Sequence, residues 1–348
     1  MNIAVVVPAH NGGSTLKRCL ASIAASSIKP DQVIVVDDGS TETVVYDLAT
    51  EYGFDYLSVP NGPTGPARAR NLGVEQAKAE LVLFVDSDVV LAHDSIERVV
   101  EVFSNSPETH AIFGSYDTSP DVQTIVSRYK NLLHHFVHQH GNKKARTFWS
   151  GFGAVRRQVF QATGGFDTSY KKPCIEDIEF GGRLAKAGFN TQLRPEIQVK
   201  HLKHWTLAGM IRTDIFCRAI PWTRLIINQN SGVSDDLNTS MKSRLSAITA
   251  ILFAVSLICT AAGLPLKYAA VFFLGAYISL DWQLFSFFQR NGGWRLAFGG
   301  AALHLLYYLY ASITFVSVHL VDWCLKATTR VIPSWIHART ISLLKNQS

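Results

Sequence analysis

The sequence predicts an α/β domain with a mainly parallel, doubly wound sheet, followed by an α-helical transmembrane region. Three short apolar runs, Ile3–Val7, Val33–Val36 and Leu81–Val85, predict strands that are buried on both faces. Segments with helical spacing separate these runs, and such a β-α-β order predicts parallel strands joined by right-handed crossovers. Beyond residue 240, long stretches with almost no charge have the length that crosses a bilayer.

The first 85 residues divide into short elements that the apolar spacing places in order. After the first strand, Ser14 is expected to cap a helix. Gly65–Lys78 is predicted to be a helix that leads into the strand before Asp86. The other expected elements are a helix face of Leu16, Cys19, Leu20 and Ile23, a short helix marked by Val44, Val45 and Leu48, and a weaker strand at Tyr56–Val59.

Each strong strand ends in a polar cluster. The clusters are Pro8-Ala9-His10-Asn11, Asp37-Asp38-Gly39-Ser40 and Asp86-Ser87-Asp88. Parallel strands place their carboxyl ends at one edge of the sheet, where ligands bind in open α/β folds. The two carboxylates of the last cluster suit a divalent cation that also holds phosphate oxygens. A single acidic triplet is also typical of a solvated turn, so the prediction rests on three clusters at one edge.

Two common nucleotide-binding motifs are absent. No GxGxxG follows the first strand, which disfavours a dinucleotide cofactor, and no GxxxxGK followed by Ser or Thr occurs, which excludes a P-loop. Arg68 and Arg70 lie in the segment PARARN, just before the acidic strand. Their guanidinium groups suit a diphosphate, and the alternative is a solvated helix face.

The set VVVPAHN, VIVVDDGS, GPARARNLGV and LVLFVDSD resembles the nucleotide-sugar-binding half of family 2 glycosyltransferases, which have the Rossmann-like GT-A fold. The resemblance covers about residues 1–205. It implies a nucleotide diphosphate sugar as donor and Mg²⁺ or Mn²⁺ as cofactor. The implied donor-binding residues are Pro8, Ala9, Asn11, Asp37, Asp38, Arg70, Asp86 and Ser87. The implied metal ligands are Asp86, Asp88 and His201, with His201 preferred over His204.

Glu176 and Asp177 begin a segment with helical apolar spacing, in KKPCIEDIEFGGRLAKAGF. Acidic residues in a first turn also stabilise the helix dipole, which is the alternative to a chemical role. The pair matches the family's ED position, where the aspartate resembles the general base. We therefore expect Asp177, with Glu176 beside it, to form the catalytic pair and the transfer to invert the sugar carbon.

Charge is distributed unevenly along the chain. After Asp236 only Asp281 and Asp322 are acidic, against nine Lys and Arg, so the formal net charge of +6 comes from the apolar C-terminal third. A basic, apolar segment indicates an anionic membrane as partner rather than nucleic acid. The five cysteines are scattered without metal or disulfide spacing, which favours a reducing cytosol for the N-terminal part.

The predicted domain organisation follows this division. Residues 1–205 form the catalytic domain, and residues 206–240, where Arg and Trp interrupt an apolar background, form interfacial amphipathic helices, with a soluble core helix as the alternative. Residues 326–348 form a basic tail, and Asp281 is expected to face protein or a polar cavity, or to lie at the membrane interface if the span begins one turn earlier. About three transmembrane helices fill residues 241–325, over Leu245–Leu264, Leu266–Phe288 and Leu296–Trp323.

These features predict a multi-pass enzyme of the inner cell membrane with its catalytic domain in the cytoplasm. Three spans would place the basic tail outside, against the positive-inside tendency, so the span count stays open. Anchoring alone needs one span, and the additional spans would hold Asp177 close to the lipid headgroups. This position predicts a lipid-linked acceptor, either a polyprenyl phosphate or a glycolipid. The alternatives are a soluble acceptor, a non-catalytic nucleotide-binding membrane protein, and a processive polysaccharide synthase, which the absence of a QxxRW motif at RAIPW disfavours.

Overall fold

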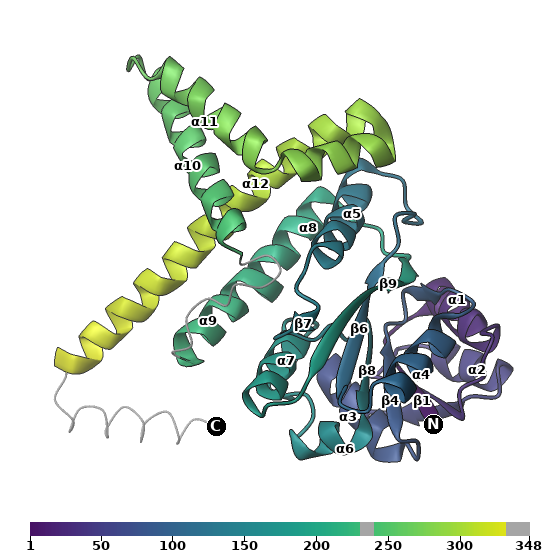
Figure 1. Cartoon of the computed structure of the whole chain (residues 1–348). Helices are drawn as coiled ribbons and strands as arrows, with labels where there is room; N and C mark the ends of the chain where they lie inside the picture. The colour runs from purple at the N-terminus through teal and green to yellow at the C-terminus, as the bar shows by residue number, and fades with distance from the viewer. Residues whose placement is uncertain (230–239, 332–348) are drawn as a thin grey trace.

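A computed structural model describes residues 1–229 and 240–331 of the 348-residue chain. Figure 1 shows an α/β unit and a group of longer C-terminal helices that pack against one side of it. The predicted interfacial segment extends into residues 230–239 and the predicted basic tail into residues 332–348. Both of these stretches lie outside the described residues.

One sheet runs through the α/β unit. Its strands are β1 (Ile3–Ala9), β2 (Gln32–Asp37), β3 (Asp55–Ser58), β4 (Leu81–Val85), β5 (Val89–Leu91), β6 (Ala111–Tyr116), β7 (Lys144–Ala145), β8 (Phe152–Arg156) and β9 (Thr191–His201). They lie in the order β3-β2-β1-β4-β8-β6-β9-β5, with β7 paired to β9. The strands from β3 to β4 in this order are parallel, as the alternation of apolar runs and helices predicts.

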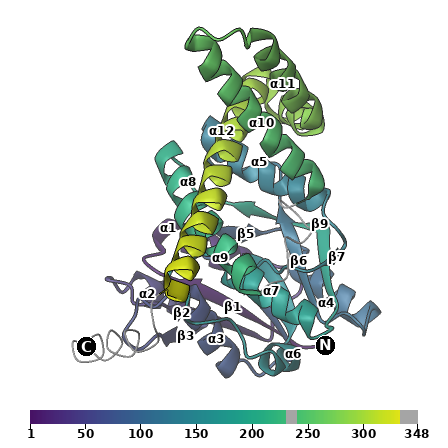
Figure 2. The same cartoon turned by 90° about the vertical axis from the view of Figure 1, so that its left-hand side faces the viewer.

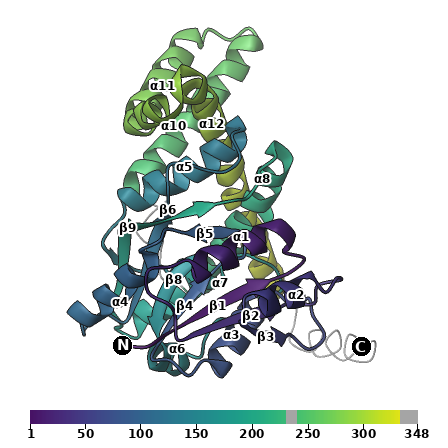
Figure 3. The same cartoon turned by 90° about the vertical axis from the view of Figure 1, so that its right-hand side faces the viewer.

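Helices cover both faces of the sheet, as Figures 2 and 3 show. One face packs against α1 (Gly13–Ala24), α2 (Val44–Glu51) and α4 (Ser95–Asn105), and the other against α3 (Pro66–Gln76), α6 (Arg157–Ala162) and α7 (Glu176–Lys186). Val5 and Val7 of β1 pack with the first group and Val6 with the second, because successive strand residues point to opposite faces. The doubly wound arrangement is therefore confirmed.

Beyond β4 the sheet is mixed. β8 lies antiparallel between β4 and β6, and β5 lies antiparallel to β9. Apolar periodicity predicts that a segment is a strand, but it does not say which strand becomes its neighbour. The reversal brings the loop before β8 to the carboxyl end of β4, where Asp86 N donates to Gly151 O at 3.1 Å.

The predicted serine cap of α1 is wrong. Gly12 is the N-cap residue and makes no side-chain cap, while Ser14 is exposed in the first turn. Asn11 forms the turn before the helix with a φ of 52°, a conformation that asparagine tolerates better than most residues. Its Oδ1 accepts a hydrogen bond from Thr41 N at 3.0 Å, so a contact with the next loop sets the start of the helix.

The remaining helices form the C-terminal group and its contact with the sheet. They are α5 (Ile125–Gln139), α8 (Leu207–Thr213), the π-helix η1 (Asp214–Ala219), α9 (Ile220–Gln229), α10 (Met241–Ala261), α11 (Lys267–Leu280) and α12 (Trp282–Val331). Figure 1 shows α10 and α11 as a hairpin that projects away from the sheet. α12 changes direction at Gly293, where φ is 69°, and packs on α5, η1 and α9.

Two helices among the described residues have the length and composition to cross a membrane, Met241–Ala261 and Trp282–Ala327. The predicted second span contains α11, an apolar helix of only 14 residues. At 1.5 Å per residue it is about 21 Å long, shorter than the roughly 30 Å hydrocarbon core of a bilayer. Among the described residues, two of the three predicted spans thus correspond to helices long enough to cross a bilayer, and the number of spans stays a prediction. Asp281 is buried between α11 and α12, as expected of an acid that faces protein.

Candidate active site

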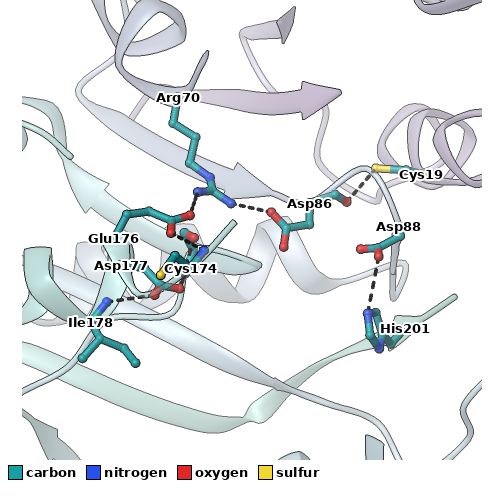
Figure 4. A network of polar contacts seen from close by, with 10 residues as sticks. Cys19, Arg70, Asp86, Asp88, Cys174, Glu176, Asp177, Ile178 and His201 are labelled. Carbon is teal, nitrogen blue, oxygen red and sulfur yellow. Dashed lines mark hydrogen bonds and ion pairs between the residues drawn. The ribbon is translucent and has the colours of Figure 1, made fainter. Parts of the chain in front are cut away.

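A buried arginine connects the two acidic motifs. Arg70 lies on α3 with its side chain 4% exposed, and it donates to Asp86 Oδ1 at 2.7 Å and to Glu176 Oε1 at 2.9 Å. Figure 4 shows this bridge between the end of β4 and the start of α7. Burial lowers the pKa of Arg70, but the charges of Asp86, Glu176 and Asp177 outweigh burial and raise the pKa overall. The guanidinium therefore keeps its charge inside the protein.

Asp38 holds the loop from which the helix of Arg70 starts. Its Oδ1 accepts a hydrogen bond from Thr64 N at 2.8 Å, and its Oδ2 accepts one from Gly65 N at 2.7 Å. Gly65 has a φ of 99°, and a Cβ there would lie 2.7 Å from the backbone of Lys171, so glycine is required. Because both carboxylate oxygens bind this loop, Asp38 positions α3, and its contact with the donor stays a prediction.

Asp88 faces a histidine across two paired strands. Its Oδ2 lies 3.5 Å from His201 Nε2, because β5 and β9 pair with Val89 opposite His201. His201 is buried and stacks on Tyr116 with ring centroids 4.2 Å apart, whereas His204 is exposed. Burial raises the pKa of Asp88, but the hydrogen bond and charge of His201 outweigh burial and lower the pKa overall.

These side chains fit a metal that shares its coordination with a ligand. Within residues 1–229 and 240–331, no group of three or more His, Cys, Asp or Glu side chains is placed to hold a metal ion. Mg²⁺ is usually held by one or two carboxylates, while phosphate oxygens and water complete its coordination. Asp86 and Asp88 at the end of β4, with His201 beside Asp88, suit such a partial set.

Asp177, the predicted base, lies in the first turn of α7. Its Oδ2 accepts hydrogen bonds from Ser150 N at 3.1 Å and Ser150 Oγ at 3.2 Å, and its Oδ1 accepts one from Ile178 N at 2.8 Å. Burial and then the adjacent charge of Glu176 raise its pKa to about 6, despite the hydrogen bond from Ser150. Such a carboxylate is ionised at neutral pH and accepts a proton more readily than an ordinary aspartate.

Glu176 has different surroundings from its neighbour. It is buried, its Oε1 accepts a hydrogen bond from Arg70, and its Oε2 accepts one from Cys174 N at 2.9 Å. Both oxygens are therefore engaged in the protein. This geometry supports a positioning role for Glu176, and its membership of the catalytic pair stays a prediction.

One cavity of about 280 Å³ brings six of the predicted site residues together. These six are Arg70, Asp86, Asp88, Glu176, Asp177 and His201. The wall on the side of the C-terminal helices includes Lys130, Thr213, Cys217, Arg218 and Trp222. The cavity thus joins the acidic sheet edge to the helices that lead toward the candidate spans.

The other predicted donor-binding residues do not line this cavity in the described part of the chain. Pro8 and Ala9 are buried at the end of β1, and Asn11 is exposed beyond it. Asp37 is buried and accepts hydrogen bonds from Ser40 N at 2.9 Å and Tyr56 OH at 3.0 Å. The residues concerned are Pro8, Ala9, Asn11, Asp37, Asp38 and Ser87. Their donor contacts stay predictions.

The structure adds an aromatic group that sequence reasoning did not assign. Trp149 lies in the loop before β8, next to Ser150, and its ring packs against Tyr116 and His134 at 4.8 and 4.6 Å between centroids. His138 packs against both His134 and Trp149, and all of these residues line the cavity. The glycines of FWSGFG were a turn signal at this loop, but nothing local indicated that the loop meets Asp177.

Replacing Arg70 by Met is expected to lower the free energy of unfolding by about 3–5 kcal/mol, because it leaves two carboxylates without their buried cation. Arg68 on the same helix is exposed, and Arg68→Met is expected to change the free energy by no more than about 0.5 kcal/mol. Thermal unfolding of both variants in detergent measures the difference. Equal melting temperatures would show that the bridge does not stabilise the fold.

Comparison with known proteins places the chain in a family. Residues 4–164 match the sequence profile of "Glycosyl transferase family 2", and residues 130–205 match that of the "N-terminal domain of galactosyltransferase". The O-antigen chain rhamnosyltransferase RfbN of Salmonella typhimurium is 25% identical over 236 residues, which cover 64% of this chain and 74% of that protein. An uncharacterized glycosyltransferase of Haemophilus influenzae is 31% identical over 182 residues, 51% of this chain and 73% of that protein.

A solved structure supports the same assignment at the level of the fold. The mannosyltransferase PcManGT from Pyrobaculum calidifontis, solved in complex with GDP-Man and Mn²⁺, superposes with a TM-score of 0.61 and 18% identity. The match covers 90% of this chain and 87% of that one, and it confirms the GT-A fold expected from the sequence motifs. The family profile spans the sheet edge with both aspartate clusters, and the match to the Haemophilus protein covers 73% of that protein. The chain therefore belongs to glycosyl transferase family 2.

Proposed function

We propose that this glycosyltransferase is bound to the inner cell membrane, faces the cytoplasm, and transfers one sugar with inversion from a nucleotide diphosphate sugar to a lipid-linked acceptor. One observation carries the proposal. The cavity lined by Asp86, Asp88 and Asp177 is also lined by residues of η1 and α9, and these two helices pack on α12. Donor chemistry and an acceptor arriving along the apolar helices would therefore meet in one cavity.

The acidic sheet edge supplies the donor end of the site. Mg²⁺ or Mn²⁺ would be held by Asp86 and Asp88, with His201 beside them, and would stabilise the charge of the departing diphosphate. That PcManGT was solved with GDP-Man and Mn²⁺ supports this use of a divalent cation. Arg70 holds one oxygen of Asp86 at 2.7 Å and so fixes the direction of that carboxylate.

Asp177 supplies the base at the acceptor end of the site. Its carboxylate takes the proton of the acceptor hydroxyl while the hydroxyl oxygen attacks the sugar carbon from the face opposite the diphosphate. A single displacement of this kind inverts the configuration at that carbon. The two hydrogen bonds from Ser150 hold the carboxylate in one orientation, and its raised pKa makes it a better proton acceptor.

The C-terminal helices support the membrane assignment. Only 17% of the residues in the apolar window of each candidate span are buried by the rest of the protein. Soluble proteins rarely expose contiguous apolar surface on this scale, and a lipid bilayer would cover it. The exposed large side chains include Leu245, Ile248, Val255, Ile258, Phe272, Phe298, Val316, Leu320 and Trp323. All five cysteines are free, in keeping with a cytoplasmic catalytic domain.

Native membranes containing the enzyme are expected to transfer labelled sugar from the nucleotide donor into a product that organic solvent extracts. A lipid-linked acceptor requires this result, because the product keeps the apolar chain. A donor screen that follows release of nucleoside diphosphate identifies the donor first, and membranes carrying Asp177→Asn provide the background. Label that enters only water-soluble product, or long polymer, would contradict the lipid acceptor.

A further inference from the structure

A buried ionic cluster lies where the catalytic domain meets the longest helix. Asp214, the first residue of η1, accepts hydrogen bonds from Lys130 Nζ at 2.7 and 2.8 Å and from Arg218 Nη1 at 3.0 Å. Tyr310 of α12 donates its hydroxyl to Asp214 Oδ2 at 2.6 Å. The cluster therefore joins three segments that are far apart in the sequence, and it contains none of the predicted site residues.

The cluster carries more positive than negative charge. Among the described residues, Lys130 and Arg218 share a single carboxylate, Asp214, and the side chains of Asp214 and Lys130 are 3% and 9% exposed. Burial, and then the charge of Arg218, lower the pKa of Lys130 to about 8. The buried pair of Lys130 and Asp214 is balanced, so the unbalanced positive charge of the cluster is that of the half-exposed Arg218 in the cavity wall. A bound anion beside these two cations would complete the cluster.

Arg218 is more exposed to a ligand than Lys130 or Asp214. Its side chain is 46% exposed, and both Arg218 and Lys130 line the cavity that contains Asp177. Asp214 holds Nη1 of Arg218, which fixes the direction of the guanidinium and leaves further N–H groups for a ligand. η1 is a π-helix, a distortion that often lies at functional sites.

Other cations lie at the acidic end of the cavity, where the donor would bind. Arg70 bonds to Asp86 at the end of β4, and the charge of Lys203 contributes to the lowered pKa of Asp88. Arg218 and Lys130 lie instead on the wall of η1 and α5, and their shared partner Asp214 bonds to α12. An anion at this wall would sit at the end of the cavity from which a lipid approaches.

We infer that Arg218, positioned by Asp214, binds a phosphate group of the acceptor, and that the acceptor is a hydroxyl-bearing sugar attached to a lipid through phosphate or diphosphate. This inference rests on the proposed function and narrows its acceptor class. Guanidinium groups bind phosphate with two parallel hydrogen bonds, which suits a group that must be held at one end while the other end reacts.

The choice of a hydroxyl rather than the phosphate itself as nucleophile follows from Asp177. A phosphate monoester is already ionised near neutral pH and needs no base, whereas a sugar hydroxyl must lose its proton during attack. The hydroxyl proton moves to the Asp177 carboxylate, the new bond forms between the hydroxyl oxygen and the sugar carbon, and the bond from that carbon to the diphosphate oxygen breaks. The nucleoside diphosphate leaves with the electron pair.

Binding of farnesyl diphosphate, farnesol and inorganic diphosphate to the full-length protein in detergent tests the inference. Wild-type protein is expected to bind farnesyl diphosphate at least roughly tenfold more tightly than farnesol, and Arg218→Gln to lose that difference. Arg218→Lys, which keeps the charge, is expected to retain part of it. Arg224→Gln is the matched control, because Arg224 is exposed on the next helix and lies outside the cavity lining.

Three results would overturn the inference. Equal affinity for farnesol and farnesyl diphosphate would mean that only the apolar chain binds. Inorganic diphosphate binding as tightly as farnesyl diphosphate would mean a site for free phosphate. Weaker binding of nucleoside diphosphate by a stably folded Arg218→Gln variant would assign Arg218 to the donor. If these binding differences hold while membranes transfer no label into lipid, the proposed function fails and the phosphate site stands.

Discussion

Replacing Asp177 by Asn is expected to lower kcat by roughly 10²-fold or more, while the affinity for the nucleotide sugar stays unchanged. Asparagine keeps the shape of the side chain but cannot accept the hydroxyl proton. In the described part of the chain, the carboxylate is held by Ser150 and Ile178 and makes no hydrogen bond to Asp86 or Asp88, where the donor would bind. Steady-state kinetics, with donor affinity measured by calorimetry, separate the two effects.

The pH profile and a second variant provide the controls. With a pKa of about 6, Asp177 is protonated below that pH, so kcat/KM of the wild type should rise about tenfold per pH unit there and level off above about pH 7. Asp177→Asn should lack this inflection, and Asp167→Asn, at an exposed carboxylate, should keep it. Loss of donor affinity in Asp177→Asn would instead make Asp177 a donor-site or structural residue.

Chelation of divalent cations is expected to reduce sugar transfer by roughly 10³-fold or more, with recovery on addition of Mn²⁺ or Mg²⁺. Asp88→Asn is expected to cause a comparable loss that added metal does not reverse. The physical reason is that a metal held by Asp86 and Asp88 would neutralise the diphosphate as it leaves the sugar. Binding of nucleoside diphosphate with and without Mn²⁺ gives a measurement that does not depend on turnover.

Asp94→Asn is the matched control for the metal prediction. Asp94 lies just after β5, its side chain is 44% exposed, and it pairs with Arg98 on the surface. Removing this charge should leave the Mn²⁺ dependence of nucleotide binding unchanged. Full activity of Asp88→Asn in the absence of metal would contradict the proposed metal site.

Local features of the sequence were sufficient to predict the sheet edge. The runs Ile3–Val7, Val33–Val36 and Leu81–Val85 would be apolar on both faces of a strand, and such strands are stable only where both faces are buried, in the centre of a sheet. The acidic residues at two of them then lie at the carboxyl ends of β2 and β4, the parallel strands on either side of β1. The start of α7 at Glu176 follows in the same way from helical spacing.

Pairing in the second half of the sheet could not be predicted in this way. Whether β8 inserts antiparallel beside β4 depends on contacts with strands far away in the sequence, and periodicity carries no record of them. The same limit applies to the spans. Leu266–Phe288 is apolar except at Asp281, and the structure divides it there between α11 and α12. The sequence shows a charge at this position, but hydropathy alone does not show that one helix ends there and another begins.

Residues close together in the chain were enough to predict the elements up to β4, the acidic clusters at the sheet edge and the acidic pair at the start of α7, because each depends on residues within a few positions of one another. Long-range packing, by contrast, sets which of two nearby arginines connects the acidic motifs. Arg68 and Arg70 have the same chemistry, yet Arg68 is exposed and Arg70 is buried between Asp86 and Glu176. The tertiary structure likewise brought Asp214 to Tyr310, 96 residues later. Such partners are set by the packing of whole elements, which no local pattern encodes.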